Sequence, residues 1–66
     1  MPIVHVMMVE GRSSEQKAEL ARKLTRCIIE TLDMPAGTVR VLIHEVNPGD
    51  WFVGGVSKAP DQDAKR

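Results

Sequence analysis

The sequence predicts an α/β fold: a single βαβ unit with parallel strands, followed by a short C-terminal hairpin and assembled as an oligomer. Two short apolar runs rich in β-branched residues, at 3–9 and 39–46, flank one amphipathic stretch at 14–32. A strand, a helix and a strand of these lengths form a right-handed crossover, in which the two strands run parallel. With 66 residues, the chain has room for one domain over 1–66 and for a thin core only.

The helix is the best-defined element of the sequence. Gln16 stands three residues after Ser13, which matches a capping box at the start of a helix. A Met-Pro pair at 34–35 ends the helix, because the residue before a proline disfavours the helical conformation. Five apolar positions share one helical face: Leu20, Leu24, Cys27, Ile28 and Leu32. Cys27 is therefore expected to be a small buried hydrophobic residue.

The second half of the chain is predicted to contain a strand, a turn and a hairpin. The strand at 39–46 is apolar along nearly its whole length, so the helix is expected to cover one face and a partner subunit the other. Residues 47–50 form a turn, and 51–56 form a small hairpin against a neighbouring subunit. Residues 58–66 are polar and contain Pro60, which is typical of a frayed tail.

Composition and charge exclude several classes of function. Nine Lys and Arg residues balance nine Asp and Glu residues, which argues against binding to nucleic acids or to an anionic membrane surface. The sequence contains no signal peptide and no apolar run of about 18 residues, so we expect a cytoplasmic protein. Cys27 is the only cysteine and cannot form an internal disulfide. Homo-oligomerisation remains as the means of stabilising so short a chain.

Pro2 is the first candidate for chemistry. Methionine is normally removed before a small residue such as proline, and loss of Met1 would leave a secondary amine with a usable lone pair at Pro2. An α-amino group titrates at about 7.7–8.0, and burial or neighbouring cations lower the pKa of such an amine toward the range where a general base works best. Without that cleavage the Pro2 nitrogen is an amide, and many proteins begin Met-Pro with no catalytic purpose.

Arg12 and Arg40 are candidate ligands of a carboxylate. Arg12 lies at the exit of the first strand, and Arg40 interrupts an apolar strand, where an unpaired charge is costly. A planar guanidinium suits bidentate binding of a carboxylate. The alternative is that neither arginine binds a ligand: Arg12 would be a solvated turn residue, and Arg40 would pair with Glu45 or Glu10. Because Pro2 and Arg12 lie at opposite ends of one strand, an oligomer would have to bring them together.

The remaining candidates carry weaker signals. Trp51 and Phe52 are the only aromatic residues, and successive strand residues point to opposite faces, so one is expected to pack inward and the other to line a cavity. Packing of both in an oligomer is the alternative. His5 and His44 fall on the two predicted strands, but two histidines do not complete a metal site, and we expect no metal and no cofactor. The methionines at 7–8 are expected only to fill the first strand.

Four short segments form a combined pattern: Pro2-Ile3, Glu10-Gly11-Arg12-Ser13 with Glu15-Gln16-Lys17, Val39-Arg40-Val41, and Gly54-Gly55. This pattern, which extends from Pro2 to about Gly55, resembles the 4-oxalocrotonate tautomerase family, the short-chain branch of the tautomerase superfamily. The resemblance implies a βαβ protomer in a homo-oligomer, usually a hexamer built as a trimer of dimers. It also implies an isomerase of aromatic hydrocarbon catabolism that acts without a cofactor on a small anionic substrate.

The resemblance also implies a role for each matching residue. Pro2 would take a proton from the dienol oxygen of a 2-hydroxymuconate-like dicarboxylate or 2-keto acid, and return it to the distal carbon. Arg12 would bind the far carboxylate, and Arg40, from another subunit, would bind the 2-oxygen and the adjacent carboxylate. Thr38 matches a small hydroxyl residue near the substrate. The backbone of Val9 matches a position that helps to hold the 2-oxygen side.

Two departures from the family pattern leave other functions open. Trp51 stands where the archetypal tautomerase has phenylalanine beside the substrate, and Phe52 where it has a small residue, so the wall of the pocket is larger. Related hydratases and dehalogenases add a carboxylate that activates water near this segment, where Asp50 is the only acid and is typical of a turn. Hydratase or dehalogenase chemistry on a related unsaturated acid is the second hypothesis. A non-catalytic oligomer that binds a small acid is the third.

Overall fold

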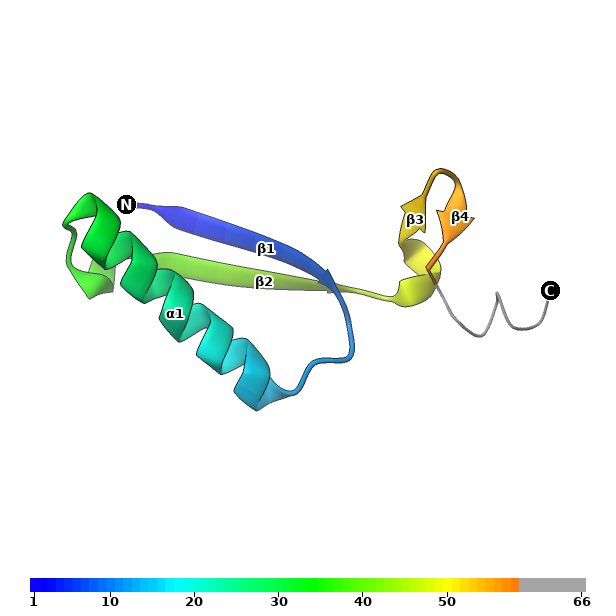
Figure 1. The fold of residues 1–66 in the computed structure, drawn as a ribbon, viewed down its shortest axis with the longest axis horizontal. Coiled ribbons are helices and arrows are strands. Elements are labelled where there is room, and N and C mark those ends of the chain that lie inside the picture. The colour runs from blue at the N-terminus through cyan, green and yellow to red at the C-terminus, as the bar shows by residue number, and fades with distance from the viewer. Residues whose placement is uncertain (59–66) are drawn as a thin grey trace.

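The computed structural model describes residues 1–58 of the chain. Its elements are β1 (Ile3–Val9), α1 (Ser14–Leu32), the 3₁₀ turn η1 (Ala36–Thr38), β2 (Arg40–Val46), the 3₁₀ turn η2 (Pro48–Asp50), β3 (Phe52–Val53) and β4 (Val56–Ser57). Figure 1 shows the βαβ unit, with the β3–β4 hairpin beyond the carboxyl end of β2. The predicted βαβ unit and C-terminal hairpin are confirmed. Of the predicted tail at 58–66, all but Lys58 lies outside the described residues.

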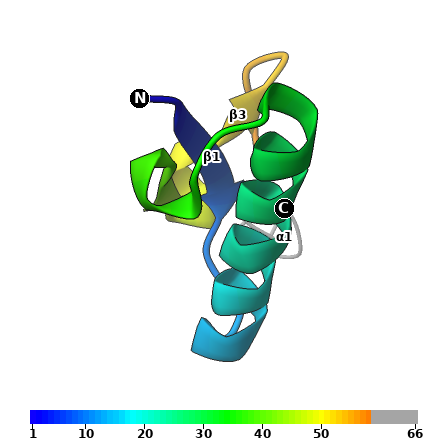
Figure 2. The same ribbon diagram turned by 90° about the vertical axis from the view of Figure 1, so that its left-hand side faces the viewer.

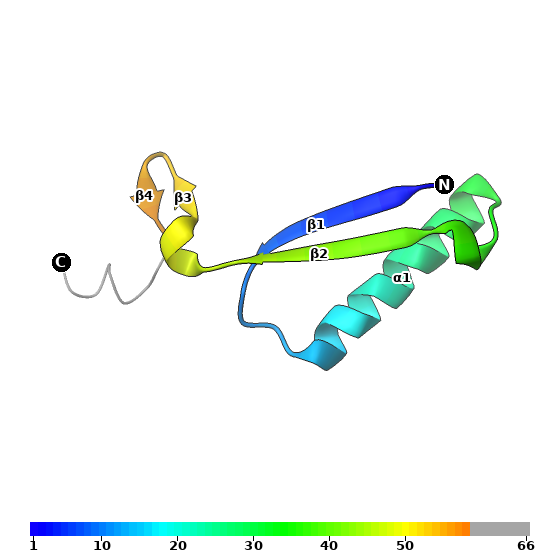
Figure 3. The same ribbon diagram turned by 180° about the vertical axis from the view of Figure 1, so that it is seen from behind.

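β1 and β2 pair in parallel over their whole length. The register runs from Ile3 opposite Arg40 to Val9 opposite Val46. Figure 3 shows the two strands side by side, with α1 crossing them on one face. Parallel pairing places both amino ends at one edge of the sheet and both carboxyl ends at the other.

Local signals at both ends define α1. The Ser13 hydroxyl accepts a hydrogen bond from the Gln16 amide at 3.1 Å, and Gln16 Oε1 accepts one from the Ser13 amide at 3.1 Å, which confirms the predicted capping box. At the other end, Asp33 adopts the left-handed conformation, with φ 55°. The helix therefore stops just before the Met-Pro pair at 34–35, as predicted.

The sheet has a covered face and an open face. Under α1 lie half-buried residues of both strands: Val4, Val6, Met8, Val41 and Ile43. On this side Lys17 of α1 forms an ion pair of 2.8 Å with Glu45 of β2. The opposite surface, here called the open face, consists of Ile3, His5, Met7, Val9, Arg40, Leu42, His44 and Val46. Among residues 1–58 none is buried, so a single protomer lacks a complete core.

The burial predicted for Cys27 is wrong, because its side chain is exposed. Its Sγ atom lies 4.0 Å from the Thr31 hydroxyl, on the flank of α1. The half-buried positions of the helix are Lys17, Leu20, Ala21, Leu24, Thr25, Ile28 and Ile29. These residues form the side of α1 that faces the sheet, and Cys27 lies outside this side. The buried side of the helix therefore differs from the apolar face that the sequence predicts.

The second strand begins one residue later than predicted. The Val39 amide donates a hydrogen bond of 3.1 Å to the Ala36 carbonyl and so closes η1 instead of joining the ladder. The predicted hairpin is formed by β3 and β4, which pair antiparallel. Gly54 and Gly55 make its two-residue turn with φ values of 61° and 83°, a conformation that favours glycine. No helix in the described part of the chain is both long and apolar enough to cross a membrane.

Candidate active site

Three predicted site residues meet at the amino end of the sheet. The Arg40 amide donates a hydrogen bond of 3.0 Å to the carbonyl oxygen of Pro2. The Arg40 guanidinium donates through Nη1 to the Gly37 carbonyl at 2.8 Å, and the Thr38 hydroxyl donates to the Pro35 carbonyl at 2.8 Å. Figure 2 shows the N-terminus and η1 at the same end of β1. Pro2, Thr38 and Arg40 therefore form one group.

The other three predicted site residues lie at the carboxyl end. Val9 ends β1 opposite Val46, Arg12 follows it in the connection to α1, and Trp51 follows η2. Beside them is a hollow of about 360 Å³, lined by Met7, Val46, Asp50, Trp51 and Phe52. This group offers an apolar and aromatic wall with one exposed guanidinium, that of Arg12, beyond the end of the strand.

One protomer cannot bring the two groups together. Six residue steps along β1, from Ile3 to Val9, span roughly 20 Å at about 3.3 Å per residue. A dicarboxylate of six carbon atoms is much shorter than this distance. Arg12 and Arg40 can therefore bind the same small substrate only if they come from different copies of the chain.

Arg12 and Arg40 are free of ion pairs within the described residues. The ion pairs of residues 1–58 join Lys17 to Glu45, and Glu19 to Arg22 and Lys23. The suggested pairing of Arg40 with Glu45 or Glu10 is therefore wrong, because Glu45 points toward α1 while Arg40 lies on the open face. Both arginines are exposed, so their guanidinium groups are available to a bound carboxylate.

The expected division of roles between Trp51 and Phe52 is wrong. Both side chains line the same hollow, with Trp51 half-buried and Phe52 59% exposed. Trp51 precedes β3 and is held by η2, since its amide donates to the Pro48 carbonyl at 3.3 Å. The alternation of a regular strand does not apply across this junction.

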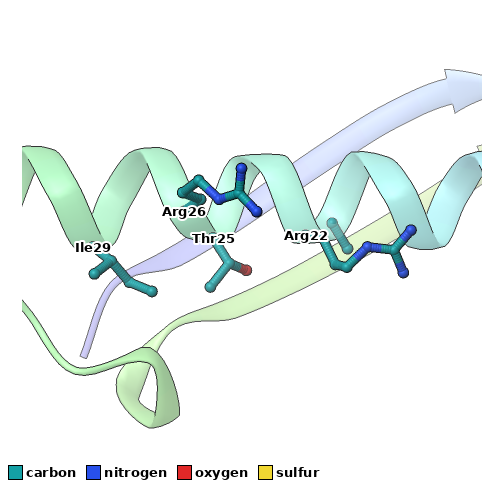
Figure 4. A pocket seen from close by; sticks show the side chains of 5 residues that line it. Arg22, Thr25, Arg26 and Ile29 are labelled. Atoms are coloured by element: carbon teal, nitrogen blue, oxygen red, sulfur yellow. The ribbon is translucent and has the colours of Figure 1, made fainter.

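A second hollow, of about 390 Å³, runs along α1 and is lined by Ala21, Arg22, Thr25, Arg26 and Ile29. Figure 4 shows its labelled side chains along one side of the helix. The Arg22 guanidinium is held there by Glu19, and this hydrogen bond, with the positive charge of Arg22, lowers the pKa of the Glu19 carboxyl. Because Arg22 is already paired and the hollow contains none of the predicted site residues, we do not assign the active site to it.

Sequence reasoning missed two contributions to the carboxyl-end group. Met7 was expected only to fill β1, and Val46 only to belong to the second strand, yet both line the hollow with Trp51. Asp50, the acid considered for the second hypothesis, lines it as well. The signal for Met7 is its place two residues before Val9, on the same face of β1. Within residues 1–58 no three His, Cys, Asp or Glu side chains are grouped to bind a metal ion.

Comparison with known proteins identifies the family of the chain. The family model for the tautomerase enzyme matches residues 2–60. A 2-hydroxymuconate tautomerase from Comamonas testosteroni is 44% identical over 57 residues, which are 86% of this chain and 90% of that protein. A probable tautomerase from Ralstonia nicotianae is 42% identical and covers 98% of this chain and 99% of its own length.

Solved structures give the same result for the fold. TomN, a 4-oxalocrotonate tautomerase homologue of the tomaymycin biosynthetic pathway, superposes with a TM-score of 0.88 at 40% identity, over 98% of this chain and all of that one. A heterohexameric 4-oxalocrotonate tautomerase from Chloroflexus aurantiacus gives 0.85 at 48% identity, over 91% and 97% of the two chains. The sequence pattern, the βαβ unit and these similarities lead to one conclusion: the chain belongs to the tautomerase family of enzymes.

Proposed function

We propose that this tautomerase isomerises a small unsaturated dicarboxylate or 2-keto acid of the 2-hydroxymuconate type from its enol to its keto form. The observation that supports this assignment is that the guanidinium groups of Arg12 and Arg40 are both exposed and free of ion pairs within the described residues, so different copies of the chain can each offer a ligand to a substrate carboxylate. The name of the Comamonas testosteroni relative supports the choice of substrate class.

Pro2 is the proposed general base and then acid. After removal of Met1, its secondary amine takes the proton of the 2-hydroxyl group and returns a proton to the distal carbon of the dienol. The enol becomes a conjugated ketone, and no proton is gained or lost overall. A nearby guanidinium such as that of Arg40 disfavours the protonated amine, which keeps the lone pair available.

The two arginines are the proposed substrate clamp. Arg40 binds the 2-oxygen and its neighbouring carboxylate, while Arg12 binds the far carboxylate and draws electron density toward it. Thr38 lies beside Arg40 and provides a hydroxyl group near the substrate. The backbone of Val9 helps to hold the 2-oxygen side of the substrate, and the side chain of Trp51 forms part of the wall of the site. Orientation and preorganised charge then lower the barrier without a cofactor or a metal.

A site of this kind requires assembly. The open face exposes Ile3, Met7 and Leu42 by 56%, 65% and 42%, an apolar surface that partner copies would cover. The two half-sites of one protomer lie roughly 20 Å apart by strand spacing, so each complete site combines different copies. We propose a homo-oligomer, specifically a hexamer built as a trimer of dimers, that acts in the cytoplasm in aromatic hydrocarbon catabolism.

The test is ketonisation of 2-hydroxymuconate, followed by ultraviolet absorbance. We expect Arg40→Ala to lower kcat/KM by about 10²–10³-fold, with the helix content and the size of the assembly unchanged. Arg26→Ala, which removes an exposed arginine of α1, is the matched control and should leave turnover near the wild-type value. Equal activity of the Arg40 and Arg26 variants would remove Arg40 from the site.

Hydratase or dehalogenase chemistry is the second candidate. It is favoured by Asp50, whose carboxylate lines the same hollow as Trp51 and could activate a water molecule there. Release of halide from a halogenated acrylate, abolished by Asp50→Asn while ketonisation persists, would establish this activity. Absence of halide release would leave Asp50 with its role in η2.

A further inference from the structure

We propose that Thr38 is a positioning residue of the active site. Its hydroxyl group stabilises the η1 turn, and the Gly37 carbonyl of this turn fixes the orientation of the Arg40 guanidinium. This role rests on the proposed function, in which Arg40 binds the 2-oxygen and a carboxylate of the substrate. The effect of Thr38 on the reaction then passes through Arg40 and needs no contact between the Thr38 hydroxyl and the substrate.

The Thr38 hydroxyl is already used within η1. It donates a hydrogen bond of 2.8 Å to the Pro35 carbonyl, which also accepts a hydrogen bond of 3.1 Å from the Thr38 amide. A hydroxyl group has a single hydrogen to donate. In this arrangement Thr38 therefore has no side-chain donor left for a substrate oxygen. The proline ring fixes φ of Pro35, here −69°, so both bonds end on a carbonyl of restricted orientation.

The hydrogen bonds of Thr38 also orient the Gly37 carbonyl. This carbonyl and the Thr38 amide belong to the same planar peptide unit. When the Thr38 amide is bound to Pro35, the direction of the Gly37 oxygen is therefore set as well. The Thr38 hydroxyl binds the same acceptor and strengthens the turn, so its loss should let the peptide unit of Gly37 rotate more freely.

Arg40 is held at both ends by this arrangement. Its backbone amide donates to the Pro2 carbonyl at 3.0 Å, and Nη1 of its guanidinium donates to the Gly37 carbonyl at 2.8 Å. An exposed arginine without such a bond samples many rotamers, which it must give up when it binds a ligand. The Gly37 carbonyl therefore selects one orientation of the guanidinium before the substrate arrives.

The hydrogen bond to Gly37 leaves the carboxylate-binding edge of the guanidinium available. Of the Arg40 side-chain nitrogens, Nη1 alone donates a hydrogen bond to a group within residues 1–58. Nε and Nη2 form the opposite edge of the planar group, and two parallel N–H donors of this kind bind a carboxylate in bidentate fashion. The turn thus orients Arg40 without competing for the donors that the proposed substrate needs.

The test is a double-mutant cycle of Thr38→Val and Arg40→Ala in the ketonisation of 2-hydroxymuconate. Valine has nearly the shape of threonine but lacks the hydroxyl. With Arg40 present, Thr38→Val should lower kcat/KM by about tenfold, with a higher KM because Arg40 already binds a carboxylate in the ground state. In the Arg40→Ala background the same change should alter kcat/KM by less than about twofold. Equal losses in both backgrounds would overturn the proposal, since Thr38 would then act on the substrate directly.

Two variants separate positioning from a merely structural role. Thr38→Ser keeps the hydroxyl and should retain a kcat/KM close to that of the wild type. Thr31→Val, which removes an exposed hydroxyl of α1, is the matched control and should leave kcat/KM unchanged. If Thr38→Val lowered the apparent kcat at an unchanged KM, in proportion to a loss of folded protein, the proposal would be overturned.

A measurement without substrate distinguishes this proposal from the proposed function. Nuclear magnetic resonance of the isotope-labelled protein measures rotation of a guanidinium about its Nε–Cζ bond, which a hydrogen bond to Nη1 slows. Rotation should be slower in Arg40 than in Arg26, an exposed arginine of α1, and Thr38→Val should remove this difference. If the wild type showed the difference but did not convert 2-hydroxymuconate, the proposed function would fail while the positioning of Arg40 would stand. Equal rotation of both arginines in the wild type would overturn the positioning.

Discussion

The backbone amide of Arg40 donates a hydrogen bond of 3.0 Å to the carbonyl oxygen of Pro2, and this bond opens the ladder between β1 and β2. It joins the proposed base to the proposed carboxylate ligand through backbone atoms alone. Substitution of either side chain leaves the amide and the carbonyl in place, provided that the strands form. Activity and folding can therefore be separated experimentally at this end of the sheet.

Blocking the nitrogen of Pro2 should abolish turnover and leave the fold intact. A tag fused before Met1 converts this nitrogen into an amide, which has no basic lone pair. General acid–base catalysis contributes about 10²–10⁴-fold, so we expect at least that loss in the ketonisation of 2-hydroxymuconate. Mass spectrometry must confirm that the untagged protein begins at Pro2.

The matched control carries the same tag after Arg66, so that the amine of Pro2 remains unblocked once Met1 is removed. Its turnover should equal that of the untagged protein. If the N-terminally tagged chain were as active as this control, Pro2 could not be the base, and the tautomerase would have to use another group.

Mixing two inactive variants should restore activity if the Arg12 and the Arg40 of one protomer contribute to two different active sites of the assembly. Arg12→Ala and Arg40→Ala each remove one arm of the clamp from every site of a pure assembly. In mixed assemblies formed at equal amounts, each arginine position is filled by an intact copy in half of the cases, so roughly a quarter of the sites hold both arginines. The readout is kcat per site after co-refolding, compared with wild type.

The outcome would differ if both arginines of an active site came from the same copy of the chain. Every site in the mixture would then lack either Arg12 or Arg40. The mixture would show no more activity than its components. A mixture of Arg40→Ala with Arg26→Ala controls for general effects of co-refolding and should show activity in proportion to its intact sites.

The helix and the first strand could be predicted to the residue, because their limits depend on local chemistry. The capping box at Ser13 and Gln16 is satisfied within one turn, and the Met-Pro pair at 34–35 acts on its immediate neighbours. The orientation of the helix could not be predicted in the same way. Cys27 belongs to the most apolar stripe of α1, yet contacts with the sheet turn that stripe partly to solvent.

The positions of individual candidate residues in the fold could be predicted from the sequence, but the surface that they form could not. The places of Pro2 and Arg40 follow from strand pairing, which the βαβ pattern determines. The hollow beside Trp51 depends on the path of the chain through η2, where Asp50 and Phe52 turn back toward Met7. Backbone angles in such a turn are set by a few hydrogen bonds, including that from the Gly49 amide to Asn47 Oδ1 at 2.8 Å, and periodicity does not reveal them.

Removal of the helix cap should lower stability without changing the chemistry. Ser13→Ala removes the hydroxyl oxygen that accepts a hydrogen bond of 3.1 Å from the Gln16 amide in the first turn of α1. Loss of such a cap typically lowers the free energy of unfolding by about 1 kcal/mol. Chemical denaturation should show a lower midpoint for this variant, with kcat within twofold of wild type at low temperature. Ser14→Ala, one residue inside the helix, should have little effect, and equal destabilisation by both changes would contradict the assigned cap.

Phe52 should limit the size of substrate that the site accepts. Its side chain lines the hollow together with Trp51 and is 59% exposed, so truncation enlarges the cavity without removing a core residue. In Phe52→Ala the larger cavity should accept the bulky phenyl group of phenylenolpyruvate, which the wild-type wall excludes. We therefore expect the ratio of kcat/KM for phenylenolpyruvate to kcat/KM for 2-hydroxymuconate to rise by about tenfold, since a difference of fit in an apolar pocket is worth about 1–3 kcal/mol. Val53→Ala is the control, because Val53 is similarly exposed, at 56%, but does not line the hollow. An unchanged ratio in the Phe52 variant would mean that the bound substrate does not reach this wall, and specificity would then depend on the two arginines alone.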